Sequence, residues 1–204
     1  MAGNRDEVQA VNFIWVGHVD TFPVMPILAK MDPAHWRGVQ ARGEIGDTRL
    51  PARSILLRAH NKPTVENWLE DLPVHDCPEI EKWASMKRLL DRARKQILQH
   101  NLLRAALDNS APIARAMLTV LEPGGTIMWH RDDGPYHDKH ARFHIPLVTN
   151  PGVTLYSGNE QVHMPVGSVW WFNNRAVHSA ANWGASMRIH LIFEMRRING
   201  EADG

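Results

Sequence analysis

The sequence has a single cysteine, Cys77, among its 204 residues. One cysteine excludes an internal disulfide, which is typical of a protein from a reducing compartment. Long apolar runs are also missing, and the first residues, Met1 to Glu7, lack the hydrophobic core of a signal peptide. We therefore expect a cytoplasmic protein that does not span a membrane.

The chain also lacks an excess of charge of either sign. It contains 23 Lys and Arg residues and 22 Asp and Glu residues, which gives a formal net charge of +1 when the histidines are neutral. This balance provides no electrostatic attraction to nucleic acid or to an anionic membrane surface. We expect neither of them as a partner.

Hydrophobic residues make up 44% of the chain, a proportion typical of a globular protein with a sizeable core. Internal repeats and low-complexity linkers are missing, so the sequence predicts one domain over residues 1–204. Within it we expect a mixed helical and strand part over residues 1–111, followed by a catalytic core over residues 112–196.

Residues 1–111 predict strands at Asn12–Val16 and Ser54–Arg58, a short helix at Pro23–Met31 and another helix start at Asp32–Trp36. Pro78–Leu107 predicts one long helix, because its apolar residues recur at helical spacing with charged residues between them. Such a helix can pack on a sheet or dock on a membrane or a partner, and packing on a sheet is the favoured interpretation.

After Pro112 the pattern changes to short strands separated by turns rich in Pro and Gly. This pattern predicts a mainly β fold with flanking helices, namely a double-stranded β-helix (a cupin-like jelly roll) with the helical N-terminal half packed on it. The expected strands are Ile113–Val120, Thr126–His130, Ala141–Val148, Val153–Ser157, Gln161–Met164, Ser168–Phe172 and Met187–Phe193.

Candidate metal ligands lie at the end of one of these strands. His130 and Asp132 are two residues apart, so on an extended strand their side chains leave the same face. With His178 they make two histidines and one carboxylate, the ligand set of non-haem Fe(II) oxygenases. Asp133 is a rival carboxylate, but we expect it to point to the opposite face.

Cationic residues that could hold an anionic co-substrate follow. Arg188, ten residues after His178, begins the last predicted strand, and its guanidinium can bind a carboxylate through two parallel hydrogen bonds. Arg142 and His144 also share one strand face and provide a second candidate cationic contact.

Taken together, these residues resemble the aspartyl/asparaginyl β-hydroxylase family, whose members are Fe(II)- and 2-oxoglutarate-dependent oxygenases on a double-stranded β-helix. The resemblance covers Ile113 to Glu194. The matching segments are Thr119–Gly124, His130, Arg142–Leu147, Pro165–Gly167, Phe172–Asn174, His178–Ser179 and Arg188–Ile192.

The resemblance implies roles for individual residues. His130 and His178 match the iron-binding histidines, and Arg188 matches the arginine that pairs with the distal carboxylate of 2-oxoglutarate. Thr119 falls where a hydroxyl residue assists that arginine. Arg142 and His144 match an Arg-x-His pair near the co-substrate.

Asp132 indicates which branch of the family the sequence resembles. The animal peptide hydroxylase that gives the family its name has glycine at this position. Bacterial relatives that act on free amino acids, or on lipid or peptide precursors, keep the carboxylate. The sequence therefore resembles the bacterial branch. A chlorinating activity is disfavoured, because non-haem halogenases need an open ligand position for chloride.

The implied activity is hydroxylation of an amino-acid side chain, free or within a peptide, with Fe(II), 2-oxoglutarate and dioxygen. A non-catalytic cupin-type protein that binds a metal or a ligand is the alternative, and a metal-dependent hydrolase or isomerase is a weaker one. Candidate substrate contacts are Arg58, His60, Asn182, Trp183 and His190.

Overall fold

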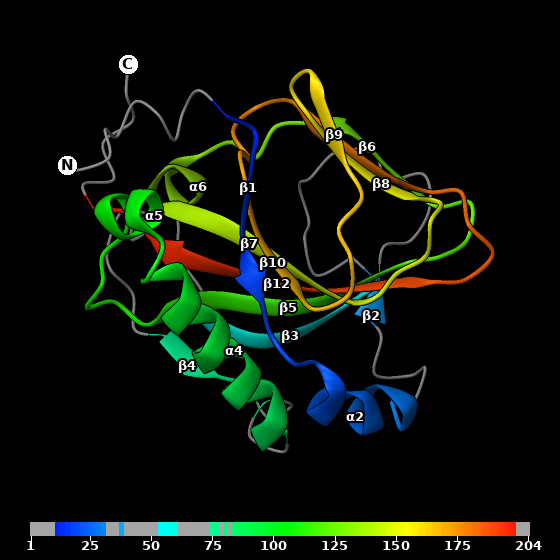
Figure 1. Ribbon diagram of the computed structural model, residues 1–204, viewed down its shortest axis with the longest axis horizontal. Helices are drawn as coiled ribbons and strands as arrows, with labels where there is room; N and C mark the ends of the chain where they lie inside the picture. Colours follow the sequence, from blue (N-terminus) through cyan, green and yellow to red (C-terminus); the bar gives the residue numbers. More distant parts are fainter. Residues whose placement is uncertain are drawn as a thin grey trace.

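The computed structural model describes residues 11–31, 37–38, 53–60, 74–77, 80 and 83–198. Within these residues the chain forms two antiparallel sheets with short helices around them (Figure 1). The predicted helix start at Asp32–Trp36 lies outside the described residues.

The larger sheet has eight strands, and it combines strands from both halves of the sequence. Its order is β1 (Phe13–His18), β10 (Ser168–Phe172), β7 (His140–Val148), β12 (Arg188–Arg196), β5 (Ile113–Leu121), β3 (Arg53–His60) and β2 (Arg37–Gly38), and β4 (Val74–Asp76) also pairs with β3. The N-terminal part therefore extends the sheet at both edges.

The smaller sheet has four strands in the order β6 (Thr126–His130), β11 (His178–Asn182), β8 (Val153–Ser157) and β9 (Glu160–Val162). Together the two sheets confirm the predicted double-stranded β-helix. The sequence analysis did not predict β11, because its central Ser179, Ala180 and Ala181 carry little of the β-branched or aromatic character that marks a strand.

The described helices are η1 (Phe22–Val24), α2 (Met25–Ala29), α4 (Ala84–Ile97), α5 (Asn101–Ala106) and α6 (Pro135–Lys139). The prediction of one long helix over Pro78–Leu107 was wrong, since α4 ends at Ile97 and α5 begins at Asn101. After Ile97 the next positions on the apolar stripe are His100 and Asn101, which are polar, so the stripe does not continue.

No helix among the described residues is long and apolar enough to cross a membrane.

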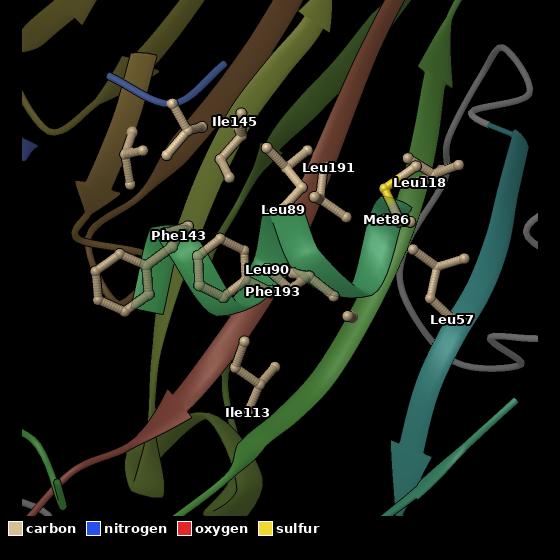
Figure 2. Packing of buried hydrophobic residues seen from close by; sticks show 14 of the residues in the cluster. Leu57, Met86, Leu89, Leu90, Ile113, Leu118, Phe143, Ile145, Leu191 and Phe193 are labelled. Carbon is tan, nitrogen blue, oxygen red and sulfur yellow. The ribbon is translucent and has the colours of Figure 1, made fainter. Parts of the chain in front are cut away.

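The main core lies between the larger sheet and α4. Figure 2 shows Met86, Leu89 and Leu90 of α4 among buried side chains from the sheet. Phe143 of β7 and Phe193 of β12 stack there with ring centroids 5.4 Å apart. The amphipathic helix thus packs on a sheet, as the sequence predicted.

The other face of the larger sheet encloses a second, smaller core with the four-stranded sheet. Its buried members are Leu121, Val153, Leu155, Met164 and Ala180. Since strand residues alternate between faces, each central strand contributes to both interiors.

β12 shows this alternation directly. Leu191 and Phe193 join the core beneath α4, whereas Arg188, which is paired with Leu121 of the second core, faces the space between the two sheets. His190 and Glu194 share that face, and both are buried. The interior between the sheets is therefore partly charged.

Candidate active site

Three candidate metal ligands converge at one end of the smaller sheet. His130 ends β6 and His178 begins β11, and the two residues lie opposite each other in the strand register. With Asp132 they offer ligand atoms that all lie within 4.8 Å of one another. This spacing suits simultaneous coordination of one metal ion.

Backbone carbonyls orient both imidazoles. His130 Nδ1 lies 2.8 Å from the Met128 carbonyl oxygen, and His178 Nδ1 lies 2.9 Å from that of Ala176. A neutral imidazole that donates from Nδ1 leaves the Nε2 lone pair for a metal. Burial lowers the pKa of His178 to about 4, so this ring is neutral at physiological pH.

Asp132 supplies the carboxylate, and its two oxygens have different surroundings. Oδ2 pairs with Arg142 and accepts a hydrogen bond of 3.2 Å from the Asn174 side chain, while Oδ1 lies 3.8 Å from His130 Nε2. Burial raises the pKa of Asp132, but nearby Arg142 and histidines outweigh it and the net pKa is lowered. Asp133 is exposed, which removes it as a rival.

Arg188 lies deeper between the sheets and is 1% exposed. Its Nη2 is 3.0 Å from His190 Nδ1, whereas Nε and Nη1 have no hydrogen-bond partner among the described residues. Burial lowers its pKa to about 9, so it stays a cation at neutral pH. A buried cation is stabilised by an anionic partner, which makes this guanidinium suited to a carboxylate.

Further polar atoms around Arg188 are also suited to a carboxylate ligand. In the described part of the chain, Thr119 Oγ1, His144 Nε2 and His190 Nε2 are buried without hydrogen-bond partners. Thr119 is paired with His190 across β5 and β12, and His144 Nδ1 lies 3.2 Å from His190 Nδ1. Burial, reinforced by Arg188, lowers the pKa of both histidines well below 6.5, so Arg188 provides the positive charge of this group.

An aromatic ring connects this polar group to the three candidate ligands. Phe172 contacts His144 edge-on at a centroid distance of 4.9 Å and His178 at 5.2 Å. The candidate metal ligands and the polar group around Arg188 therefore lie in one interior. This arrangement fits Fe(II) together with a keto diacid, which has a carboxylate at each end.

The sequence profile of the aspartyl/asparaginyl beta-hydroxylase family matches residues 89–198, more than half of the chain. The chain belongs to this family. The assignment confirms the resemblance noted in the sequence and makes the protein a 2-oxoglutarate-dependent non-haem iron oxygenase. A comparison with curated protein sequences gave no significant match.

Solved structures share the fold of this oxygenase. A 2OG-Fe(II) oxygenase family oxidoreductase from Burkholderia pseudomallei is 14% identical, with a TM-score of 0.59 over 96% of this chain and 89% of that chain. A prolyl-4-hydroxylase from Pseudomonas putida is 12% identical, with a TM-score of 0.56 over 95% and 97%. The viral collagen prolyl hydroxylase of Paramecium bursaria Chlorella virus-1 is 9% identical, with a TM-score of 0.53 over 94% and 99%.

Arg142 of the oxygenase lies beside the metal ligands but makes different contacts from those that the sequence suggested. The prediction gave it a contact to the co-substrate. Its guanidinium instead pairs with Asp132 through Nη1 and with Glu194 through Nε and Nη2. These contacts favour a role in holding Asp132.

Of the two predicted substrate contacts on β3, Arg58 does not lie with the candidate metal ligands. Arg58 donates to Asp76 at 2.6 Å, and Asp76 also pairs with Lys87 of α4, the helix that covers the opposite face of the larger sheet. These contacts give Arg58 a structural role. The backbone of His60 pairs with Val74, and its side chain lies outside the described residues.

Asn182 and Trp183 lie at the opposite end of β11 from His178, about 13 Å along the strand. The Asn182 amide donates to the carbonyl oxygens of Leu121 and Ser186. Trp183 is 67% exposed. This placement argues against contacts of either residue with a substrate bound at the metal ligands.

His190, also predicted as a substrate contact, lies instead beside Arg188.

Sequence reasoning missed several residues that surround Asp132. Asn174 donates to Asp132, and Glu194 accepts from Arg142, Arg115 and Tyr136. Asn174 was part of the family resemblance but had no assigned role. A glutamate directly after the apolar run Leu191–Phe193 was the available signal for Glu194, since a buried charge requires a partner.

Proposed function

We propose that this oxygenase hydroxylates an amino-acid side chain, either free or within a peptide. One observation carries the proposal, namely that His130, Asp132 and His178 converge in the same interior as the buried, incompletely paired guanidinium of Arg188. The family name supports an amino-acid substrate. The prolyl hydroxylases that share the fold are consistent with it.

In this proposal the two histidines and Asp132 bind Fe(II) on one side of the ion. Fe(II) held in this way, with 2-oxoglutarate and dioxygen, supplies the oxidising power that converts a C–H bond to C–OH, with release of succinate and carbon dioxide. The carbonyls of Met128 and Ala176 keep the imidazoles in the tautomer that can bind a metal.

Arg188 binds the distal carboxylate of 2-oxoglutarate in this proposal. Thr119 donates a further hydrogen bond from its hydroxyl, and His144 and His190 line the same group. Phe172 contacts both His144 and His178, and its ring excludes water between them. These residues orient the co-substrate toward the metal ligands.

The test is a succinate-release assay that compares free amino acids with short peptides, followed by mass spectrometry for the gain of one oxygen. We expect His178→Ala and Arg188→Ala each to abolish succinate production. Full turnover by either folded variant would contradict the assignment of that residue.

A spectroscopic experiment separates this function from simple binding. Fe(II)-loaded protein mixed with 2-oxoglutarate without oxygen should develop the weak visible absorption of the chelate. A cupin-type protein that binds a metal without the co-substrate would develop none, and family membership favours the first result.

A further inference from the structure

A buried series of ion pairs extends from Asp132 to two neighbouring strands of the larger sheet, through Arg142 of β7 and Glu194 of β12. Arg142 contacts Asp132 through Nη1, and it contacts Glu194 Oε1 through Nε at 3.1 Å and Nη2 at 2.8 Å. All three side chains are less than a tenth exposed. Arg142 is therefore fixed from both sides by carboxylates.

Glu194 is held in turn by Arg115 and Tyr136. Arg115 donates to both of its oxygens, at 2.9 and 2.7 Å, and the Tyr136 hydroxyl donates to Oε2 at 2.7 Å. The Arg115 guanidinium also lies over the Tyr136 ring, 4.7 Å from its centroid. These contacts fix Glu194 in position.

The charges in this network balance. Arg115 and Arg142 are cationic and Asp132 and Glu194 are anionic, so the four side chains sum to zero. Burial raises the pKa of Glu194, but the two guanidinium groups outweigh it and hold the pKa well below its usual range. Loss of the Glu194 charge would leave Arg115 without this salt bridge and Asp132 as the one carboxylate paired with the buried Arg142 among the described residues, an imbalance that would pull on the Asp132 carboxylate.

We propose that Glu194 and Arg142 are positioning residues that hold Asp132 as a metal ligand through one oxygen only. The proposal rests on the metal centre proposed above. Arg142 and Asn174 occupy Oδ2, and Oδ1 remains on the side of His130. Coordination through one oxygen would leave room on the metal for a chelating keto acid and dioxygen.

The difference between Arg142 and Arg188 supports this division of roles. Every nitrogen of Arg142 contacts a carboxylate of the chain, whereas Arg188 contacts only His190 within the part of the chain that is described. Arg188 is therefore the arginine for the co-substrate, and Arg142 orients a ligand.

Binding of Mn(II), a redox-silent substitute for Fe(II), tests the proposal without turnover. We expect Glu194→Gln to weaken Mn(II) binding, measured by calorimetry, by about tenfold or more, which is the usual effect of losing a group that orients a ligand. Asp76→Asn is the matched control, since it also removes a carboxylate from an Arg and Lys contact, but on the side of α4. It should leave Mn(II) affinity unchanged.

A second readout separates positioning from general destabilisation. The visible spectrum of the Co(II)-substituted protein reports coordination number, so it should change in Glu194→Gln and in Arg142→Lys but not in Asp76→Asn. If Glu194→Gln does not fold, Tyr136→Phe removes one hydrogen bond to Glu194 and keeps every charge. It should weaken Mn(II) binding in the same direction by a smaller factor.

The outcomes also distinguish this proposal from the metal centre itself. Absence of Mn(II) binding to the wild type, or unchanged binding in His178→Ala, would overturn the metal centre. Normal binding to the wild type, loss in His178→Ala, and unchanged affinity and spectrum in folded Glu194→Gln would overturn only the positioning role. For a Glu194→Gln variant that does not fold, unchanged affinity in Tyr136→Phe would do the same.

Discussion

A buried guanidinium without a carboxylate partner among the described residues distinguishes Arg188 from the other interior arginines. Arg142 and Arg115 share Glu194, so their charges are balanced by the chain. In the part of the chain that the structure describes, the Arg188 guanidinium has only the neutral His190 as a hydrogen-bond partner. In the function proposed above, the unbalanced charge would give this single residue a large share of the affinity for the anionic co-substrate.

Replacement of Arg188 by methionine should therefore weaken 2-oxoglutarate binding, because it removes the cation that would pair with the distal carboxylate. Loss of one partner from a buried charge pair costs about 2–5 kcal/mol, which corresponds to about 30-fold or more in Kd. Tryptophan fluorescence quenching of the Mn(II)-loaded protein under titration with 2-oxoglutarate would measure the change. Arg104→Met, on the exposed face of α5, is the control. An affinity in Arg188→Met equal to that of this control would contradict the role.

At the level of single elements, the match between sequence and structure depends on how local the signal is. The spacing of His130 and Asp132 is a local pattern on one strand end, and it led directly to candidate metal ligands whose side chains converge with His178. The role of Arg142 depends on Glu194, which lies 52 residues away. Because no local pattern reports a pairing at that separation, the sequence could suggest a cationic contact but could not identify its partner.

Strand and helix limits show the same dependence. The strand predicted at Met187–Phe193 continues as β12 to Arg196, so Glu194 was left outside it. β11 was missed because pairing with β6 and β8, rather than its own composition, holds it in place. The helix over Pro78–Leu107 divided where its apolar stripe stopped. Local periodicity predicted elements well where one face is uniformly apolar.

Helix α4 packs on the larger sheet, which carries Arg142 and Arg188, and Leu90 of α4 is 3% exposed in the core between them. Leu90→Ala should lower the free energy of unfolding by about 2–5 kcal/mol, because it leaves a cavity against the sheet. Urea denaturation would measure this loss. Arg92→Ala on the exposed face should change the free energy by less than about 0.5 kcal/mol. Equal effects of the two variants would contradict the packing of α4 on the sheet.

At the scale of the whole molecule, we propose that the chain is a single domain. β1 from the N-terminal part pairs with β10 of the core, and β3 pairs with β5. α4 and α5 cover the face formed jointly by these strands. The N-terminal part therefore completes a shared sheet and a shared core.

The buried neutral histidines make stability depend on pH. His144 and His190 have pKa values below 6.5 when folded and recover ordinary values when unfolded, so the unfolded chain binds more protons below about pH 6.5. The free energy of unfolding should therefore fall as pH decreases from about 6.5, by up to about 1.4 kcal/mol per pH unit for each histidine. His178, with its pKa near 4, acts in the same direction.

Urea unfolding of metal-free protein between about pH 7.5 and pH 5 would measure this dependence. Carboxylates contribute little over this range, because their unfolded pKa values lie near 4. A folded His190→Gln variant should show a shallower slope. A stability that stays constant or rises on acidification would contradict the neutral state of these histidines.

The alternation along β12 has a consequence for how such an enzyme can change. Leu191 and Phe193 support the hydrophobic core, and Arg188, His190 and Glu194 between and beside them face the interior of the proposed active site. Insertions or shifts of register in this strand would disturb both at once. Adaptation to a new substrate is therefore expected to proceed through loops and rim residues, while the strand that unites the two tasks stays nearly fixed.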